Sequence, residues 1–366
     1  MIFGINGFGR IGRTTFRVWW ERFGQFGSSQ LGAINTSGSS DVEAWAHLLK
    51  YDSNYGVWPR NVKVNVYRTA KEATDELPEI GTFELEGPTG KQVITITAQR
   101  DPAKIPWSRY GVETVIESTG AFVTPEKAGL HFTGGANNVV ISAPGKGEGL
   151  TTSVLGVDQY DALQGKLKTD QVLDRSGTQV VVSNASCTTN CVGPVSQIMV
   201  SKFGVKKAML TTVHAYTDDQ NLQDNSHKDL RRARSAAKNI VPTSTGAAIA
   251  TALVIPELKG VFDGLAIRVP VSTGSLSDIT FVTSRPTTVD EVNAAFEAAA
   301  AEERWRGILA VTRDPIVSSD IVGRPESAIV DLDLTQVVDG DLVKVVAWYD
   351  NEWGYCNRLI ELVHGF

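Results

Sequence analysis

The feature that most constrains the fold is a glycine pattern near the N-terminus, Gly7-Phe8-Gly9-Arg10-Ile11-Gly12. It lies between a short apolar run, Ile2 to Ile5, and an amphipathic stretch, Arg13 to Phe23, which predicts a strand, a tight turn and a helix. Without Cβ atoms the turn can approach a pyrophosphate, and the helix N-terminus offers amide donors and a positive dipole end. The alternative is a glycine-rich turn without a ligand, and the strand–turn–helix context favours a dinucleotide site.

Strands and helices alternate after this turn. Leu31 to Ile34 and Val42 to Leu49 read as the next strand and helix, and further parallel-strand signals follow at Thr114 to Glu117, Asn138 to Ser142 and Gln179 to Ser183. This order favours a doubly wound parallel sheet.

The stretch from Val62 to Ala98 has a different pattern. Its valines and threonines alternate with polar residues, which is typical of antiparallel strands with one solvated face. The charged piece Lys71 to Glu79 between them reads as a surface insertion, and no function is assigned to the region 71–86.

The chain after Ser186 predicts a second domain. Helices are expected at Cys191 to Phe203 and at Val289 to Glu303, the latter capped by Thr287 or Thr288. Strands are expected at Lys207 to Val213, Leu265 to Pro270, Ser277 to Thr283 and Leu342 to Tyr349. The predicted fold class is therefore α/β, with a doubly wound Rossmann domain and an α+β catalytic domain built on a mixed sheet. The expected boundaries are 1–185 for the first domain, joined by a C-terminal helix at about 351–366, and 186–350 for the second.

Composition narrows the function classes. The formal net charge of −6 gives no electrostatic reason for binding nucleic acid or an anionic membrane. No apolar run reaches the ~20 residues of a membrane span, and no leader precedes Ile2. The three cysteines are too few for a disulfide framework, so we expect reduced thiols and a cytoplasmic protein.

Cys187 is the candidate nucleophile. The run Ser186 to Cys191 follows a predicted strand and opens a helix, a position at which the helix dipole stabilises a thiolate. Cys191 and Cys356 read as buried structural residues. Because no second pair of ligands accompanies Cys187 and Cys191, a metal site is not expected.

Of the five histidines, His214 is best placed to act as the base, because it ends a predicted strand and begins a polar loop. His47 reads as packing or surface, and His227 as structural. Anion-binding groups follow, and each arginine could instead belong to a salt-bridge network. These groups are Arg231, Arg232, Arg234, the run Thr243 to Gly246 before a helix at Ala247, and the lone charge Arg268 in an apolar strand.

The second strand lacks the acid that usually holds the ribose 2′-hydroxyl of NAD. It ends at Ile34-Asn35-Thr36 and continues with Ser37, Ser39 and Ser40, and the first carboxylate, Asp41, lies beyond the turn. A carboxylate would repel a 2′-phosphate, whereas hydroxyl groups can donate to it. The sequence therefore favours NADP or use of both coenzymes over strict NAD, although a hydroxyl-rich loop could still prefer NAD.

At these residues the chain resembles the phosphorylating glyceraldehyde-3-phosphate dehydrogenases. The matching segments span nearly the whole chain, and Ser183 to Cys191 is the most specific of them. They are Gly4 to Arg13, His47 to Asp52, Ser183 to Cys191, His227 to Arg234, Leu258 to Gly260 and Tyr349 to Glu352.

The resemblance implies a role for each matching site residue. Cys187 would be the nucleophile and His214 its base. The substrate C3 phosphate would be surrounded by Thr217, Asp219, Arg232 and Arg268, and inorganic phosphate by Ser186, Thr188, Thr245 and Gly246. The nicotinamide coenzyme, NAD(P), would contact Asn6, Gly7, Gly9, Arg10, Ile11, Gly12, Asn35, Thr36, Ser118, Thr119, Asn351 and Tyr355.

The resemblance also implies a homotetramer, in which the loop Ala215 to Ile240 would lie near a neighbouring subunit's coenzyme. Two departures bear on the coenzyme. NAD-specific members usually have Asp where this chain has Thr36, and Leu-Pro where it has Asn225-Ser226. Chloroplast-type members that use NADP place a serine at the position of Ser226, and Arg100 matches an arginine that can reach the 2′-phosphate.

The implied reaction is the reversible oxidation of glyceraldehyde 3-phosphate to 1,3-bisphosphoglycerate. His214 would accept the Cys187 proton to give a thiolate–imidazolium pair, and the thiolate would form a thiohemiacetal and then a thioester. Erythrose-4-phosphate dehydrogenase is the nearest alternative activity. A semialdehyde dehydrogenase of the aspartate pathway, or a nucleotide-binding regulator without turnover, fits the motifs less well.

Overall fold

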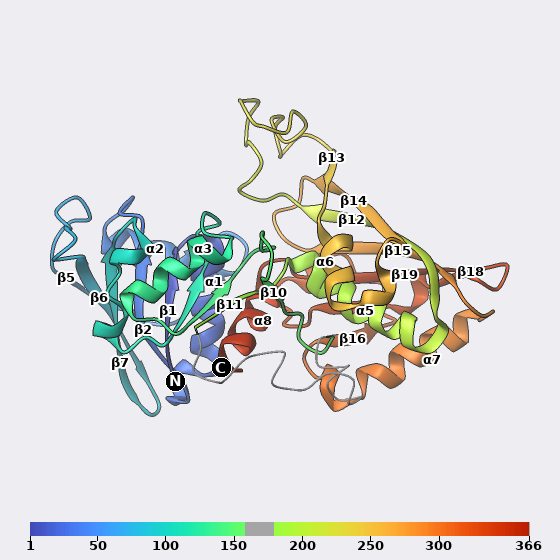
Figure 1. Cartoon of the computed structure of the whole chain (residues 1–366), viewed down its shortest axis with the longest axis horizontal. Coiled ribbons are helices and arrows are strands. Elements are labelled where there is room, and N and C mark those ends of the chain that lie inside the picture. The colour runs from blue at the N-terminus through green and yellow to red at the C-terminus, as the bar shows by residue number, and fades with distance from the viewer. Residues whose placement is uncertain (158–178, 366) are drawn as a thin grey trace. The chain divides into compact units, whose positions relative to one another are not determined.

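The computed structural model describes residues 1–157 and 179–365 (Figure 1). The described chain divides into two compact units, each with its own sheet. The first contains residues 1–153, 179–185 and 356–365, and the second contains 154–157 and 186–355. No helix in these residues is long and apolar enough to cross a membrane.

The first unit is built on an alternation of strands and helices. Its elements are β1 (Ile2–Asn6), α1 (Arg10–Arg22), β2 (Gln30–Thr36), α2 (Val42–Lys50), β3 (Tyr51–Asp52), β4 (Gly56–Val57), β5 (Lys63–Val66), β6 (Glu79–Gly87), β7 (Gly90–Ala98), β8 (Thr114–Glu117), α3 (Pro125–Ala128), β9 (Asn138–Ile141), β10 (Thr151–Thr152) and β11 (Val180–Ser183). The described strands of its main sheet follow the order β10-β11-β9-β8-β1-β2-β7-β6-β5.

The strand order places a topological switch point at β1. This strand pairs in parallel with β2 on one side and with β8 on the other, although β8 comes much later in the chain. In doubly wound sheets a ligand binds outside the carboxyl ends of the strands at such a point. Asn6, Thr36 and Glu117 are the last residues of these three strands, so the residues that follow them meet at one edge.

The antiparallel region was only partly predicted. β7 continues the parallel sheet beside β2, while β6 pairs with β7 and β5 pairs with β6, both in antiparallel fashion. The strand β6 was missed because Glu79, Glu84 and Glu86 obscure its apolar face, in which Ile80, Phe83 and Leu85 are buried. The predicted surface insertion, Lys71 to Glu79, ends where β6 begins at Glu79.

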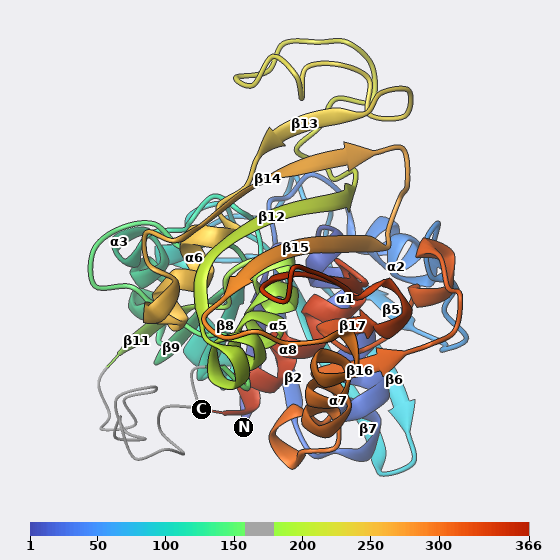
Figure 2. The same cartoon turned by 90° about the vertical axis from the view of Figure 1, so that its right-hand side faces the viewer.

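The second unit has a mixed sheet with helices on one face (Figures 1 and 2). Its elements are α5 (Cys187–Phe203), β12 (Val205–Ala215), β13 (Val241–Ser244), α6 (Ala247–Val254), β14 (Phe262–Val269), β15 (Ser275–Thr283), α7 (Val289–Ala300), β16 (Leu309–Thr312), β17 (Ala328–Asp331), β18 (Gln336–Val338), β19 (Leu342–Tyr349) and α8 (Trp353–His364). Its described main path runs β13-β14-β12-β15-β19-β17-β16, with β18 paired to β19.

The last element, α8, begins in the second unit and continues in the first. Within the first unit it contacts α1, because Arg22 donates to the Asn357 side chain at 2.8 Å and pairs with Glu361. The Cys356 thiol lies 3.6 Å from the carbonyl oxygen of Ile11.

Strand alternation assembles one end of the second sheet. In β12, Ala208, Leu210, Thr212 and His214 are buried, whereas Met209 between them is 62 % exposed. The register then sets His214 beside Arg268 of β14, and Ser275 of β15 beside Tyr349 of β19. Polar side chains from four strands are thereby placed at the same end of the sheet.

Candidate active site

The glycine turn of the first unit has the geometry of a dinucleotide site. Gly7 has φ 95° and donates its amide to Asn35 O at 2.9 Å, and a Cβ at Gly12 would lie 2.1 Å from Gly7 O. These two glycines are therefore required by the turn itself. A Cβ at Gly9 would meet nothing within 4 Å, and Gly9 caps α1 without any side-chain hydrogen bond. The open space beside Gly9 at the N-terminus of α1 therefore fits a pyrophosphate.

The floor of this site is a buried polar network. Asn6 donates to Glu117 at 2.5 Å and accepts from Asn35 at 2.7 Å. Glu117 also accepts from the amide of Thr119 at 2.8 Å and from His131 Nε2 at 3.0 Å. The Ser118 hydroxyl donates to the carbonyl oxygens of Asn6 and Gly7. The predicted residues from the ends of β1, β2 and β8 are thus brought together.

Arg10 and Thr36 have partners that the sequence did not reveal. The Arg10 guanidinium pairs with Asp52 at 2.9 Å. Thr36 is 1 % exposed, and its hydroxyl donates to Thr97 O at 3.0 Å. The Thr36 side chain is therefore engaged within the sheet, and the exposed hydroxyl groups of this edge belong to the serines that follow it.

The inserted loop packs beside these serines. The amide of Ala70 donates to Asp41 Oδ1 at 2.6 Å, and Asp75 accepts from Gln99 at 2.8 Å and pairs with Lys104. Arg100 is exposed, and its Nε donates to Ser37 O at 3.1 Å. One Asp41 oxygen is thereby drawn to the loop, while the Arg100 guanidinium is held next to Ser37.

Cys187 is the first residue of α5, so the helix starts four residues earlier than predicted. Ser186 caps it, with Oγ accepting the amide of Thr189 at 3.0 Å. Just before the cap, Ala185 has φ 53°, a left-handed conformation that is unfavourable for a residue with a Cβ. The strained turn and the cap together place the Cys187 thiol at the positive end of the helix dipole.

His214 faces this thiol. Its Nε2 lies 3.4 Å from Cys187 Sγ, and its Nδ1 lies 2.6 Å from Ala215 O. A carbonyl oxygen can only accept, so Nδ1 carries the hydrogen and Nε2 keeps its lone pair toward the sulfur. His214 is the second-last residue of β12 rather than the start of a loop, because the strand extends to Ala215.

Burial controls the titration of this pair. Burial, together with the positive charge of Arg268, lowers the pKa of His214 to about 3. Burial raises the pKa of Cys187, opposed by Arg268 and by hydrogen bonds from Thr188. The chain's own groups therefore favour the neutral thiol and imidazole over the expected thiolate–imidazolium pair, so proton transfer has to accompany attack on a substrate.

Arg268 is a half-buried cation, and one of its donors has no partner in the described residues. Its Nη1 donates to Ala215 O at 3.1 Å and to Thr217 Oγ1 at 3.2 Å. Its Nε is buried, with no hydrogen-bond partner in the described residues. An unpaired buried guanidinium nitrogen is costly, and a phosphate oxygen would satisfy it. Arg268 and Thr217 therefore fit an anion site beside His214.

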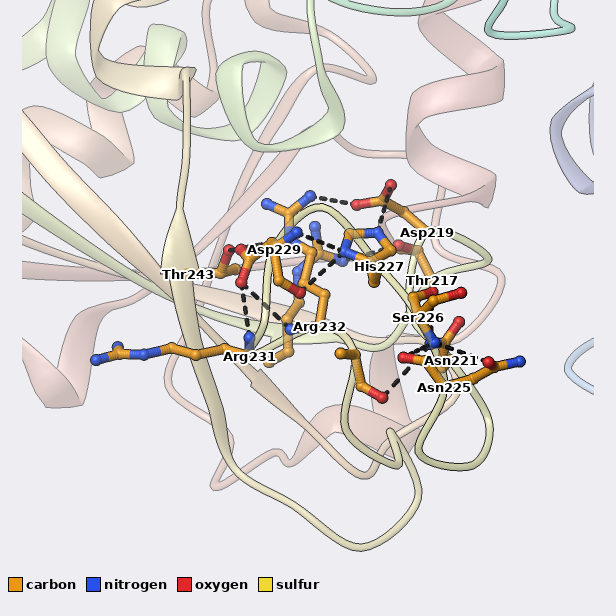
Figure 3. Close-up of polar contacts among 12 residues, drawn as sticks. Thr217, Asp219, Asn221, Asn225, Ser226, His227, Asp229, Arg231, Arg232 and Thr243 are labelled. Atoms are coloured by element: carbon orange, nitrogen blue, oxygen red, sulfur yellow. Dashed lines mark hydrogen bonds and ion pairs between the residues drawn. The ribbon is translucent and has the colours of Figure 1, made fainter.

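Arg232 belongs to a separate network in the loop between β12 and β13 (Figure 3). It pairs with Asp219 and with Asp229, and its Nε donates to Thr243 Oγ1 at 2.9 Å. His227 Nδ1 accepts the amide of Asp229 at 2.9 Å. The two carboxylates hold the Arg232 guanidinium in place.

The second predicted anion site uses two helix N-termini. Thr188 lies in the first turn of α5, after its cap Ser186. Gly246 caps α6 without a side-chain bond, and Thr245 Oγ1 accepts the amide of Ala247 at 3.2 Å. The two helices pack against each other. Hydroxyl groups and helix amides of this kind suit an inorganic anion.

Asn351 is fixed by two bonds to its oxygen. Its Oδ1 accepts from Gly274 N at 3.1 Å and from Ser275 Oγ at 2.9 Å, which fixes the orientation of the amide and makes its nitrogen the donor group. Ser275 Oγ in turn accepts the amide of Ala215 at 3.1 Å. Tyr355, four residues after Asn351, is buried, with 5 % of its surface exposed. Ser226 lies in the exposed loop between β12 and β13, where its amide donates to Asn225 Oδ1.

Sequence reasoning missed several polar residues of these sites. Tyr349, Thr212 and Ser275 lie under the Cys187–His214 pair, and Glu117 and His131 lie under the glycine turn. Sequence patterns gave none of them a role in the site. Their partners are distant in sequence, so no local pattern could have identified them. No group of metal-binding side chains occurs in the part of the chain that the structure describes.

Comparison with known proteins gives one consistent result. Residues 1–125 match the family "Glyceraldehyde 3-phosphate dehydrogenase, NAD binding domain", and residues 186–351 match "Glyceraldehyde 3-phosphate dehydrogenase, C-terminal domain". The chain is 48% identical over 361 residues to "Glyceraldehyde-3-phosphate dehydrogenase 2" of Streptomyces avermitilis, covering 98% of this chain and 96% of the relative.

Two further relatives agree. The "Glyceraldehyde-3-phosphate dehydrogenase" of Streptomyces coelicolor is 48% identical over 361 residues, and that of Mycobacterium tuberculosis is 47% identical over 362 residues. Each alignment covers 98% of this chain and 96% of the relative. Both family matches and nearly full-length similarity point the same way, and the chain belongs to the glyceraldehyde-3-phosphate dehydrogenase family.

Proposed function

We propose that the chain catalyses the reversible phosphorylating oxidation of glyceraldehyde 3-phosphate. The observation that carries the proposal is the Cys187–His214 pair, 3.4 Å apart, with the guanidinium of Arg268 and its unpaired Nε next to it. A nucleophile, a base and an anion site are what a covalent reaction on a phosphorylated aldehyde requires. The names of the relatives support the same substrate.

The first half of the reaction uses the thiol. Cys187 Sγ attacks the aldehyde carbon while His214 Nε2 takes the thiol proton, giving a thiohemiacetal on Cys187. The amides at the start of α5 stabilise the oxyanion. Arg268 and Thr217 hold the C3 phosphate, with Arg232 supported by Asp219. His214 gives its proton to the oxyanion, which becomes the hydroxyl group of the thiohemiacetal, and takes that proton back as the thioester forms. The nicotinamide coenzyme would supply the acceptor for the hydride that leaves the same carbon.

The second half uses inorganic phosphate. We assign its binding to Ser186 and Thr188 on α5 and to Thr245 and Gly246 on α6. A phosphate oxygen attacks the thioester carbon, the carbon–sulfur bond breaks, and the electron pair returns to Cys187 Sγ. The product is an acyl phosphate, so the energy of oxidation is kept in a reactive bond.

For the coenzyme we propose NADP or use of both coenzymes rather than strict NAD. The Thr36 hydroxyl group donates to Thr97 O, and Asp41 accepts from the amide of Ala70. Neither residue is therefore a free carboxylate of the kind that holds the ribose 2′-hydroxyl of NAD, which supports this proposal. Arg100, held at Ser37, would attract a 2′-phosphate. We further propose that Asn6, Arg10, Ser118, Thr119 and Asn351 contact the coenzyme, with Tyr355 packing against it and Ser226 contributing from a neighbouring subunit.

We propose a homotetramer in the cytoplasm. The β12–β13 loop extends beyond the sheet edge (Figures 1 and 2). Large apolar side chains are exposed on this loop, on the strands β12 and β14 and on α6. They include Met209, Leu222, Leu230, Ile240, Ile249, Leu253 and Leu265. Such a surface suits contact with further copies of the chain. The three free cysteines fit a reducing compartment.

A substrate panel tests the proposed reaction. Initial rates of coenzyme reduction are measured with glyceraldehyde 3-phosphate, erythrose 4-phosphate and unphosphorylated glyceraldehyde, each with and without inorganic phosphate. We expect the highest kcat/KM for glyceraldehyde 3-phosphate and a steady-state rate that depends on phosphate. A preference for erythrose 4-phosphate, or oxidation that ignores phosphate, would overturn the assignment. Sedimentation equilibrium separately tests the tetramer.

A further inference from the structure

Three buried hydroxyl groups form a chain beneath the nucleophile. The Tyr349 hydroxyl lies 3.0 Å from Thr188 Oγ1 and 2.8 Å from Thr212 Oγ1, and the three side chains are at most 4 % exposed. The tyrosine ring also meets the His214 ring edge-on at 5.9 Å between centroids. The proposed reaction gives Thr188 a role in binding phosphate but gives none to Tyr349 or Thr212.

Hydrogen counting restricts how this chain can be arranged. Each hydroxyl group has one hydrogen to donate, and a buried hydroxyl that donates to nothing is unfavourable. Tyr349 can therefore donate to only one of its neighbours. In one direction Thr212 donates to Tyr349 and Tyr349 donates to Thr188, so the Thr188 hydrogen is free to point away from Tyr349. In the other, Thr188 donates to Tyr349 and the chain ends with Thr212 donating to Leu276 O.

The site itself favours the first direction. The bond that would end the opposite chain, from Thr212 Oγ1 to Leu276 O, is long at 3.3 Å. At the other end the Thr188 hydroxyl group can donate to the Cys187 thiolate, whose pKa it lowers. A hydrogen bond to an anion is stronger than one to a neutral acceptor, and successive hydroxyl groups in a chain reinforce one another.

We propose that Tyr349 is a positioning residue for the phosphate step: its hydroxyl donates to Thr188 Oγ1 and thereby directs the Thr188 hydrogen toward the anions at Cys187. This inference rests on the proposed function. During phosphorolysis the phosphate oxygen attacks the thioester carbon and the carbon–sulfur bond breaks toward sulfur. The incoming phosphate and the leaving thiolate are both negative, so a Thr188 hydroxyl group held as a donor serves each of them.

A double-mutant cycle in the full-length protein tests this coupling. Rates are measured at saturating aldehyde and coenzyme while inorganic phosphate is varied. Tyr349→Phe is expected to raise the phosphate KM about five- to thirtyfold, which corresponds to one hydrogen bond, and to change the aldehyde KM by less than twofold. In a Thr188→Val background the same change is expected to leave the phosphate KM unaltered. An equal increase in both backgrounds, or none in either, would overturn the proposal.

Two further variants test the direction of the hydrogen bonds in the hydroxyl chain and separate it from general damage to the fold. Thr212→Val removes the inner hydroxyl group and leaves Thr188 as the remaining acceptor of the three-member chain, so its effect on the phosphate KM is expected to be at most about twofold. An increase as large as that of Tyr349→Phe would contradict the assigned direction. Tyr110→Phe is the control, because it removes the hydroxyl group of a half-buried tyrosine that is bonded to Glu79 in the first unit.

A readout without substrate separates this inference from the proposed function. The groups that face Cys187 are His214 from β12, Arg268 from β14, Tyr349 from β19 and Cys191 on its own helix. The rate of iodoacetamide alkylation of Cys187 is followed against pH. Tyr349→Phe and Thr188→Val are both expected to move the midpoint to higher pH. An unchanged midpoint would contradict the proposed coupling of Tyr349 to Cys187 through Thr188. If the wild-type protein showed no phosphate-dependent oxidation, only the proposed function would be contradicted.

Discussion

His214 and Arg268 lie side by side on the parallel strands β12 and β14, and both donate to the carbonyl oxygen of Ala215. The distances are 2.6 Å from His214 Nδ1 and 3.1 Å from Arg268 Nη1. This shared acceptor fixes the hydrogen of His214 on Nδ1 and directs the lone pair of Nε2 to Cys187. It also brings a positive charge next to the imidazole, which disfavours protonation of His214.

His214→Asn should therefore slow turnover by roughly 10²–10⁴-fold, the usual effect of losing a general base. Coenzyme binding should be nearly unchanged. Steady-state kinetics and a coenzyme titration measure the two effects. His47→Asn is the control, because His47 is exposed on α2. A His214 variant with wild-type turnover would remove His214 from the proposed reaction.

Arg268→Met should abolish the preference for a phosphorylated substrate. The variant loses the guanidinium whose Nε lacks a partner in the described residues. We expect kcat/KM for glyceraldehyde 3-phosphate to fall about ten- to a hundredfold, as for a lost hydrogen bond to a charged group, and that for glyceraldehyde to fall less. Arg231→Met is the matched control, since its side chain extends away from the polar network in Figure 3. Equal losses on both substrates would count against Arg268 as a phosphate ligand.

Much of the fold could be predicted from local pattern. The strand Leu342–Tyr349 was placed with its observed bounds, and Thr288 caps α7 by accepting the amide of Glu291. Period and capping residues are local signals, which explains this success. The strand Glu79–Gly87 was missed because its charged residues obscure a buried apolar face. The start of α5 was placed too late because the residues after Ser186 are polar, although the Ser186 cap allows the helix to begin at Cys187.

The candidate site likewise contains residues that local patterns identified and residues that they could not identify. Cys187, His214 and the glycine turn were recognised because each follows a strand or opens a helix. Tyr349 could not be recognised, because its partner Thr188 is 161 positions away and meets it only through the packing of α5 on the sheet. The roles of Thr36 and Asp41 also depend on distant partners, Thr97 and the amide of Ala70.

Coenzyme preference should depend on Arg100. We expect the wild-type protein to use NADP at least as well as NAD, and Arg100→Ala to lower kcat/KM for NADP about tenfold while changing that for NAD little. Lys91→Ala is a suitable control, because Lys91 pairs with Glu84 on β6. A large wild-type preference for NAD in kcat/KM would refute the proposed NADP use.

The reactivity of Cys187 should increase toward alkaline pH. Burial raises the pKa of this thiol, so the reactive thiolate gains population only as pH rises through that value. His214, with a pKa of about 3, stays neutral above pH 5 and adds no acid limb to the profile. Alkylation of Cys187 by iodoacetamide between pH 5 and 10 measures this. A plateau of high reactivity already at pH 5–6 would indicate a preformed thiolate–imidazolium pair instead.

The covalent intermediate on Cys187 is the central claim, and Cys187→Ser should abolish turnover while retaining coenzyme binding. The most direct measurement is mass spectrometry of the protein after reaction with glyceraldehyde 3-phosphate and coenzyme in the absence of inorganic phosphate. We predict an acyl adduct on the peptide that contains Cys187, its loss when phosphate is added, and no adduct in Cys187→Ser. An adduct on another residue, or full turnover by Cys187→Ser, would contradict the account.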